Sequence, residues 1–198
     1  MGRPRAEEVT TSTRDRLLEA AEQEFADVGF EAAKLADIAA RAGIRRPSLL
    51  YHFKTKEDLY AATVEQAFTQ LGVALQATMS AAGDFEARLL ATVVGYARFV
   101  ADHPNVARIV LRETLHGLGP GAEIVLRQIV PIVDAVEDFI RTQGQRASNT
   151  PPVRAAILAL ASALLVRSAA SGLREPLWRD ESDHAAALGR ALFLGGAA

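Results

Sequence analysis

The sequence has no cysteine among its 198 residues. Disulfide bonds, thiolate nucleophiles and thiolate metal sites are therefore excluded. Glycine-rich phosphate loops and the Ser-x-x-Lys and Gly-x-Ser-x-Gly motifs are also absent, and the four histidines are scattered along the chain. The sequence therefore does not support an enzyme, and we expect no catalytic residues and no cofactor.

Long apolar runs are absent as well. The longest, from Ala155 to Val166, stops at Arg167, well short of the roughly 20 residues that a membrane span needs. The first residues, Met1 to Arg5, lead into acids and threonines rather than an apolar segment, which predicts that there is no secretory signal. We therefore expect a cytoplasmic protein with no membrane partner.

The chain also lacks a strong overall charge, because its formal net charge is only −2. This excludes a wholly basic nucleic-acid protein, but the distribution of charge is uneven. Between Arg41 and Lys56 there are five basic residues and no acid. Local charge decides where a phosphate backbone docks, so this segment is a candidate nucleic-acid surface.

The composition is that of a folded protein, with 49% apolar and 23% charged residues. Apolar residues recur at helical spacing, and no stretch alternates in the way of a half-buried strand. Start and stop signals predict an all-α fold of about nine helices. Ser12 with Asp15 and Thr55 with Asp58 are spaced as helix caps, Asn105 can cap another helix, and Gly29 suits the position just past the end of the first helix. The expected ranges are 12–30, 35–42, 46–52, 55–75, 84–103, 105–115, 122–143, 152–172 and 182–194.

The segment from Leu35 to Phe53 has the pattern of a helix-turn-helix. Gly43 accepts a positive φ in the turn at low cost, and the small Ala39 lets the second helix cross closely. Ile38, Ile44 and Leu49 are placed to form the small core that fixes the crossing angle. The outward positions of the second helix would then face the major groove of DNA.

Five stretches carry a resemblance to a known family: RLLEAA (16–21), FADVGF (25–30), DIA (37–39), AGI (42–44) and LLYHFKTKEDL (49–59). In this order and spacing they make residues 13–60 similar to the DNA-binding domain of TetR-family transcriptional regulators. The resemblance covers about a quarter of the chain. It implies a basic arm at 1–11, a DNA-binding domain at 12–60, and a ligand-binding and dimerisation domain at 61–198.

The resemblance also implies which side chains meet DNA. Tyr51 and His52 match positions that contact DNA, and Lys56 matches a lysine that grips the phosphate backbone. Lys34 stands where the family often has a capping threonine or serine, so that cap should be weak. The full set of expected DNA-binding residues is Lys34, Arg45, Arg46, Pro47, Ser48, Tyr51, His52, Lys54, Thr55 and Lys56.

Arg45 and Arg46 leave an alternative open, because each can read guanine or bind phosphate. Two neighbouring aromatics have different expected roles. Phe53 is the better core residue, whereas Tyr51 is expected on the surface. The arginine arm at Gly2 to Arg5 resembles arms that enter a minor groove, although a tail without that role is an equal alternative.

The second half of the chain is too apolar to serve DNA binding alone. The helix at 152–172 suits burial on two sides, one side its own core and the other a partner subunit. A single helix-turn-helix also offers little area for tight specific binding, which favours a dimer. The expected dimer-interface residues are Leu158, Ser162, Leu165, Leu188, Ala191 and Leu192.

A ligand pocket is expected among the helices of this second domain. Its candidate lining residues are Tyr96, Phe99, His103, Ile109, Arg112, Glu113, His116, Phe139 and Trp178. Glu113 and His116 are three residues apart, as in some metal sites, but no second such pair supports a metal. The sequence therefore predicts a ligand of apolar character and no metal.

Taken together, these patterns predict a transcriptional regulator. The resemblance implies a homodimeric repressor that binds a palindromic operator in double-stranded DNA and is released by a small molecule, and the apolar character of the domain favours a hydrophobic or amphipathic one. The alternative is a helix-turn-helix regulator without a small-molecule inducer, controlled by a protein partner or by its abundance.

Overall fold

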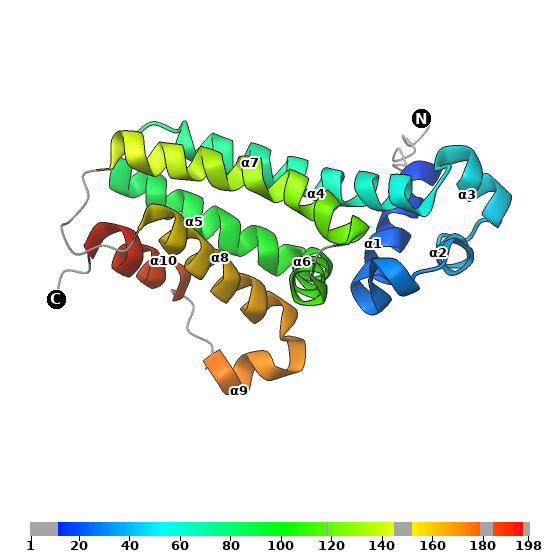
Figure 1. Cartoon of the computed structure of the whole chain (residues 1–198). Helices are drawn as coiled ribbons and strands as arrows, with labels where there is room; N and C mark the ends of the chain where they lie inside the picture. The colour runs from blue at the N-terminus through cyan, green and yellow to red at the C-terminus, as the bar shows by residue number, and fades with distance from the viewer. Residues whose placement is uncertain (1–11, 118, 145–151, 179–183, 196–198) are drawn as a thin grey trace, which may run out of the picture.

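The computed structural model describes residues 12–117, 119–144, 152–178 and 184–195 (Figure 1). These residues form ten α-helices and no strand, which confirms the predicted all-α class. The arginine arm within residues 1–11 lies outside the described residues. The helices are α1 (Thr13–Ala32), α2 (Leu35–Arg41), α3 (Arg46–His52), α4 (Lys56–Met79), α5 (Phe85–Asp102), α6 (Pro104–His116), α7 (Pro120–Gln143), α8 (Val153–Ala169), α9 (Arg174–Trp178) and α10 (His184–Gly189).

Helix α1 begins as the sequence predicts, at a capping box. The hydroxyl of Ser12 accepts from the backbone N–H of Asp15, whose carboxylate accepts from the N–H of Ser12. Its end is different from the prediction. Gly29 does have a positive φ of 83°, but the chain turns helical again and continues to Ala32. Gly29 is therefore a kink inside α1 and does not end the helix.

Helices α2 and α3 form the predicted helix-turn-helix. Gly43 has a φ of 70° in the turn, and Ile38, Ala39 and Leu49 are almost completely buried. Ile44 is half-buried and packs on this small core. The side chains of the second helix that do not join the core are left on the surface.

Helix α4 connects the helix-turn-helix to the rest of the molecule. It starts with a second capping box, in which Thr55 and Asp58 exchange hydrogen bonds. It then runs without a break from Lys56 to Met79 and packs on α1, α5 and α7 (Figure 1). The domain boundary expected at residue 60 thus falls inside one continuous helix, which both halves share.

The remaining helices form a bundle in which α8 packs on α5, α6 and α7. Helix α6 starts one residue earlier than predicted, at Pro104. Asn105 does not cap it, because its side-chain oxygen accepts from Arg108 instead. The short α9 was not predicted. The last helix lies partly outside the described residues, and α10 passes into the π-helical segment η2 (Arg190–Gly195).

None of the described helices is both long and apolar enough to cross a bilayer.

Candidate nucleic-acid interface

Helix α3 presents the predicted polar residues to solvent. Arg45 is its N-cap, and Arg46, Pro47 and Ser48 form its first turn, all exposed. Proline is tolerated there because its missing N–H would have no helical partner. Leu49, one residue further on, is fully buried and anchors the helix. The first turn is therefore held from below while its outer side chains remain accessible.

The last turn of α3 carries an aromatic pair. Tyr51 is 79% exposed, and its ring meets the ring of His52 edge-on, with centroids 5.4 Å apart. The ammonium of Lys54 lies 6.0 Å from the Tyr51 ring. Phe53, by contrast, is buried, as expected for a core residue. An exposed tyrosine beside two cationic or polar groups suits contact with a phosphate backbone.

The other three predicted DNA-binding residues sit at helix starts. Lys34 is the exposed N-cap of α2 and makes no side-chain capping bond, in line with the expected weak cap. Thr55 uses its hydroxyl to cap α4.

Lys56 differs most from its expected role. Its ammonium donates to the backbone oxygen of Glu31 at 2.9 Å and lies 4.7 Å from the centre of the Phe30 ring. The side chain thus ties the start of α4 to the end of α1, and only the remaining N–H donors of the ammonium can reach a phosphate.

The sequence prediction left out two residues at the start of α1. An open hollow of about 510 Å³ is bordered by Thr13 of α1 together with Ile44 and the α3 residues Pro47, Ser48, Tyr51 and His52. Arg14 is exposed, and its guanidinium lies 5.6 Å from the Phe53 ring. The basic residue at position 14 was the available signal, but it stands apart from the basic run at 41–56.

Not all of the basic run faces outward. Arg41 forms ion pairs with Glu24 at 3.1 Å and with Asp27 at 3.6 Å, both on α1. Asp27 also pairs with Arg108 of α6 at 3.4 Å. Arg112, one turn along α6, donates to the backbone oxygens of Ala26 and Asp27. These contacts hold α6 against the DNA-binding half, and the carboxylate of Asp27 pairs with an arginine from each, Arg41 of α2 and Arg108 of α6.

The predicted ligand residues do not line one pocket. Tyr96 borders an apolar cavity of about 80 Å³ between α4, α5, α7, α8 and η2. Ile109 and Phe139 are core residues. Phe99 is buried and stacks on the half-buried His103, with ring centroids 4.2 Å apart.

The remaining candidates are also scattered. Glu113 borders a separate hollow where α6 meets α7. Arg112 reaches away to α1, and Trp178 is half-buried on α9. His116 is exposed, with its Nδ1 2.8 Å from the backbone oxygen of Arg112. The nine candidates, of which we expect only about a third to line a pocket, therefore do not share one space, because these side chains point in different directions from α5, α6, α7 and α9.

The apolar cavity is lined by residues that the sequence did not single out, among them Ile132, Val136, Leu160 and Phe193. Their apolar character is shared with the whole core, so no sequence signal separates them. The cavity offers a ligand almost no polar group. The hydroxyl of Tyr96 donates to the backbone oxygen of Ala161 at 3.3 Å, and burial raises its pKa, so it stays an uncharged phenol.

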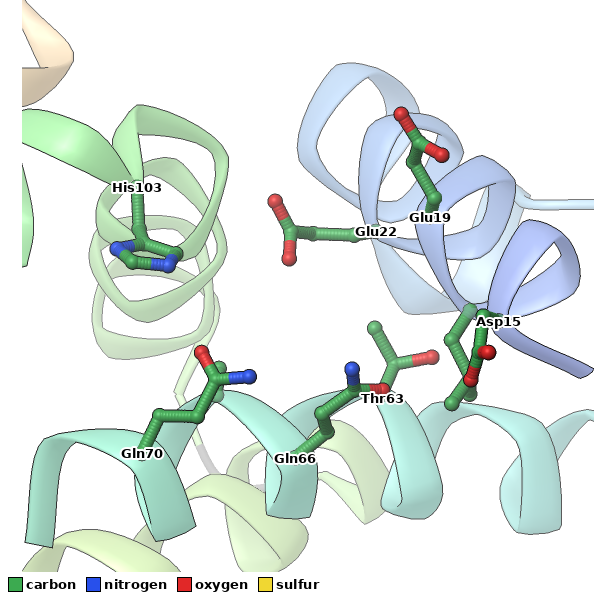
Figure 2. Close-up of a pocket in the computed structure, with 9 residues that line it drawn as sticks. Asp15, Glu19, Glu22, Thr63, Gln66, Gln70 and His103 are labelled. Atoms are coloured by element: carbon green, nitrogen blue, oxygen red, sulfur yellow. The ribbon is translucent and has the colours of Figure 1, made fainter. Parts of the chain in front are cut away.

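A polar hollow of about 270 Å³ lies where α1 and α4 meet the end of α5 (Figure 2). Asp15, Glu19 and Glu22 border it from α1, and Glu22 points toward His103 across the hollow. Burial raises the pKa of the Glu22 carboxyl, against the lowering effects of Asn105 and His103. The described residues contain no group of three or more side chains that could hold a metal ion.

The expected dimer residues divide into two groups. Leu158, Ser162 and Ala191 are exposed, with Leu158 at 46%. Leu165, Leu188 and Leu192 are half-buried and pack on the core of their own chain. Val166, also exposed, lies on the same stripe of α8 as Leu158 and Ser162, at four-residue spacing.

The site and the fold define a class: a helix-turn-helix DNA-binding protein on a helical bundle. Comparisons agree. Residues 17–63 match the model of the bacterial regulatory proteins of the tetR family. The chain is 28% identical over 148 residues to the HTH-type transcriptional activator FasR of Mycolicibacterium smegmatis, covering 74% of this chain and 68% of FasR. It is 28% identical over 184 residues to the repressor BepR of Brucella suis, covering 92% of this chain and 77% of BepR.

The fold is shared along nearly the whole chain. The fatty acid degradation regulator FadR of Bacillus halodurans superimposes with a TM-score of 0.74 at 17% identity, covering 92% of this chain and 99% of FadR. A TetR-like regulator from Rhodococcus superimposes with a TM-score of 0.71 at 21% identity, covering 98% and 97%. Residues 17–63 thus carry a DNA-binding domain of the TetR type, and the comparisons support a TetR-type DNA-binding transcriptional regulator. Proteins of this family are not enzymes.

Proposed function

We propose that this regulator is a homodimeric repressor that binds a palindromic operator and is released by a small apolar molecule. One observation carries the proposal. Helix α4 is a single helix whose first turn lies beside the exposed DNA-binding face, while its residue Leu75 lines the apolar cavity. A molecule that pushes on the cavity wall therefore moves the element that positions α3.

In this proposal, α3 enters the major groove with its first turn toward the base edges. Of Arg45 and Arg46, one reads a guanine and the other binds a phosphate. Tyr51, His52 and Lys54 hold the flanking backbone. Lys34, Pro47, Ser48 and Thr55 complete the contact surface around them, and Lys56 keeps the start of α4 against α1.

Dimerisation through α8 and the α10 region supplies the second recognition helix. The exposed stripe of Leu158, Ser162 and Val166 supports this, because its two apolar side chains gain stability from burial against a second copy and the small Ser162 between them allows close approach. Two recognition helices must lie about 34–36 Å apart, or a related spacing, to enter successive major grooves. A ligand that favours another spacing weakens operator binding by its difference in affinity for the two states.

The similar proteins include a named activator and a named repressor. Operator binding, which either kind of regulator requires, is tested first. DNase footprinting on the DNA that flanks the gene, with competitor DNA at physiological salt, should reveal a protected near-palindrome. Arg46→Ala should then lose about 1–3 kcal/mol of operator affinity if Arg46 reads a base. Arg127→Ala, on the exposed side of α7, is the matched control and should leave the affinity unchanged.

A second candidate is a regulator without a small-molecule inducer, and the size of the apolar cavity favours it. At about 80 Å³, the cavity is far smaller than the roughly 300–1,000 Å³ typical of ligand pockets. Ligand control therefore requires the cavity to widen. Operator affinity that stays constant across a broad screen of apolar compounds would support this second candidate.

A further inference from the structure

A basic hollow of about 360 Å³ lies between α5, α8, α9 and α10, on the half of the molecule that does not contact DNA. Arg98, Arg167, Arg174 and His184 border it, and none of the described residues that line it is acidic. Arg98 and Arg174 are exposed and have no ion pair within the described part of the chain. A hollow lined in this way attracts an anion.

The apolar cavity lies beside this basic hollow, along the same pair of helices. On α8, Leu160 lines the cavity and Leu164, one turn on, lines the hollow; on α5, Tyr96 lines the cavity and its neighbour Ala97 lines the hollow. In the C-terminal segment, α10 packs on α5 and α8, and η2 packs on α8.

The start of α10 borders the basic hollow at Ala185, and η2 borders the cavity at Phe193. Eight residues separate these two positions, a rise of roughly 12 Å at helical spacing. The two spaces therefore lie within the length of one extended molecule.

The two spaces differ sharply in chemistry. In the cavity, the hydroxyls of Tyr96 and Thr92 are already bonded, to the backbone oxygens of Ala161 and Arg88, so hydrocarbon is the group that fits. In the hollow, guanidinium groups favour a carboxylate or phosphate. We propose that the ligand of this regulator is an amphiphile, with an anionic head held by Arg98 and Arg174 and a hydrocarbon tail that enters the cavity.

This inference rests on the proposed ligand control and specifies its chemistry. The tail passes between α5 and α8 where the side chains are small, at Ala97 and Ala161. To admit it, the hydroxyl of Tyr96 must give up its hydrogen bond to the backbone oxygen of Ala161. The site is also compatible with the proposed dimer. On α8, Leu164 and Ser168 border the hollow and lie roughly 80–160° around the helix from Leu158 and Ser162, on a different face.

The test uses the full chain without DNA and four probes with the same 12-carbon tail, each below its micelle concentration. Isothermal titration should show binding of dodecanoate and dodecyl phosphate. Binding of 1-dodecanol and of dodecyltrimethylammonium should be at least 10-fold weaker. Octanoate should bind more weakly than dodecanoate, because less tail is buried. Equal affinity for all heads, or for acetate and dodecanoate, would overturn the proposal.

Variants separate the two parts of the site. Arg98→Gln combined with Arg174→Gln should weaken dodecanoate at least 10-fold and leave 1-dodecanol unchanged. Arg127→Gln is the matched surface control. Ala161→Phe should abolish binding of every probe by filling the cavity. If that variant is unstable, Ile132→Phe replaces it and should have the same effect. Arginine variants that bind dodecanoate as tightly as the parent protein would overturn the head assignment.

Two further readouts separate this proposal from its rivals and from the proposed function. Dodecanoate should raise the melting temperature, as a ligand of the native state does; a fall would mean detergent action and overturn the site. Binding only to vesicles of phosphatidylglycerol would identify a membrane surface contact and also overturn it. If dodecanoate binds but operator affinity is unchanged, ligand control fails while the site stands.

Discussion

Replacing Gly29 with alanine tests whether α6 is docked on the kink in α1. Gly29 has φ 83° and ψ 169°, a region that is occupied almost only by glycine. Its backbone also lies directly under the side chain of Arg112. A methyl carbon added at position 29 would lie 2.7 Å from Cδ of Arg112, so the arginine must move away.

The expected cost has two parts. The backbone conformation costs an alanine about 1–3 kcal/mol. Moving Arg112 removes its hydrogen bonds to the oxygens of Ala26 and Asp27, at 3.3 and 2.9 Å, which contribute about 1.5–3 kcal/mol between them when the donor is charged and half-buried. Gly29→Ala should therefore lower the free energy of unfolding by about 3–5 kcal/mol.

The assay is urea unfolding of the full chain, followed by circular dichroism at one fixed protein concentration, since dimerisation would add to stability. Gly43→Ala is the matched control. Its φ of 70° is also positive, but nothing lies within 4 Å of the added carbon, so it should cost only about 1–2 kcal/mol.

The double variant Gly29→Ala with Arg112→Gln sharpens the test. Because Gly29→Ala already removes the Arg112 contacts, the two changes together should cost clearly less than their sum. A cost for Gly29→Ala equal to that of Gly43→Ala, or simple additivity, would refute the argument that Arg112 docks on the kink.

Three further changes test single features of the fold. Glu22→Gln should raise the free energy of unfolding at pH 7, because burial raises the pKa of Glu22 and the ionised form opposes folding. The gain should disappear below pH 4.5, the ordinary pKa, where the native residue is protonated; a constant gain would contradict this. Tyr60→Phe should stabilise the protein by about 1 kcal/mol in the same assay, because the buried hydroxyl of Tyr60 makes no hydrogen bond within the described part of the chain; a loss would mean that the nearby Glu113 carboxylate accepts from it. Ser12→Ala should cost about 1 kcal/mol through the lost cap of α1, and a neutral result would mean that this helix end frays.

The sequence predicts well the features that depend on neighbouring residues. Both capping boxes, at Ser12 and Thr55, join groups only three positions apart, and the helix-turn-helix depends on short spacings around Gly43. The exposed and buried aromatics, Tyr51 and Phe53, follow from the faces of one short helix. These local rules place the helix-turn-helix and the starts of α1 and α4.

Features that depend on distant residues could not be predicted in this way. The kink at Gly29 continues into another helical turn beneath Arg112, which is more than 80 positions away. The candidate ligand residues point into separate spaces, because their directions are set by how α5, α6 and α7 pack. The short α9 could not be predicted because its one leucine, Leu177, and the preceding Leu173 are both exposed and give no apolar period.

The shared carboxylate of Asp27 has a consequence for protein engineering. It joins Arg41 of the helix-turn-helix and Arg108 of the bundle, and Arg112 binds the backbone beside it. A chimera that fuses residues 12–60 to the bundle of another regulator keeps only one side of this contact. Such hybrids should respond to the ligand of the foreign bundle only if its α6 carries arginines at the positions of Arg108 and Arg112. These two residues therefore decide which ligand-binding bundles can be joined to this DNA-binding half.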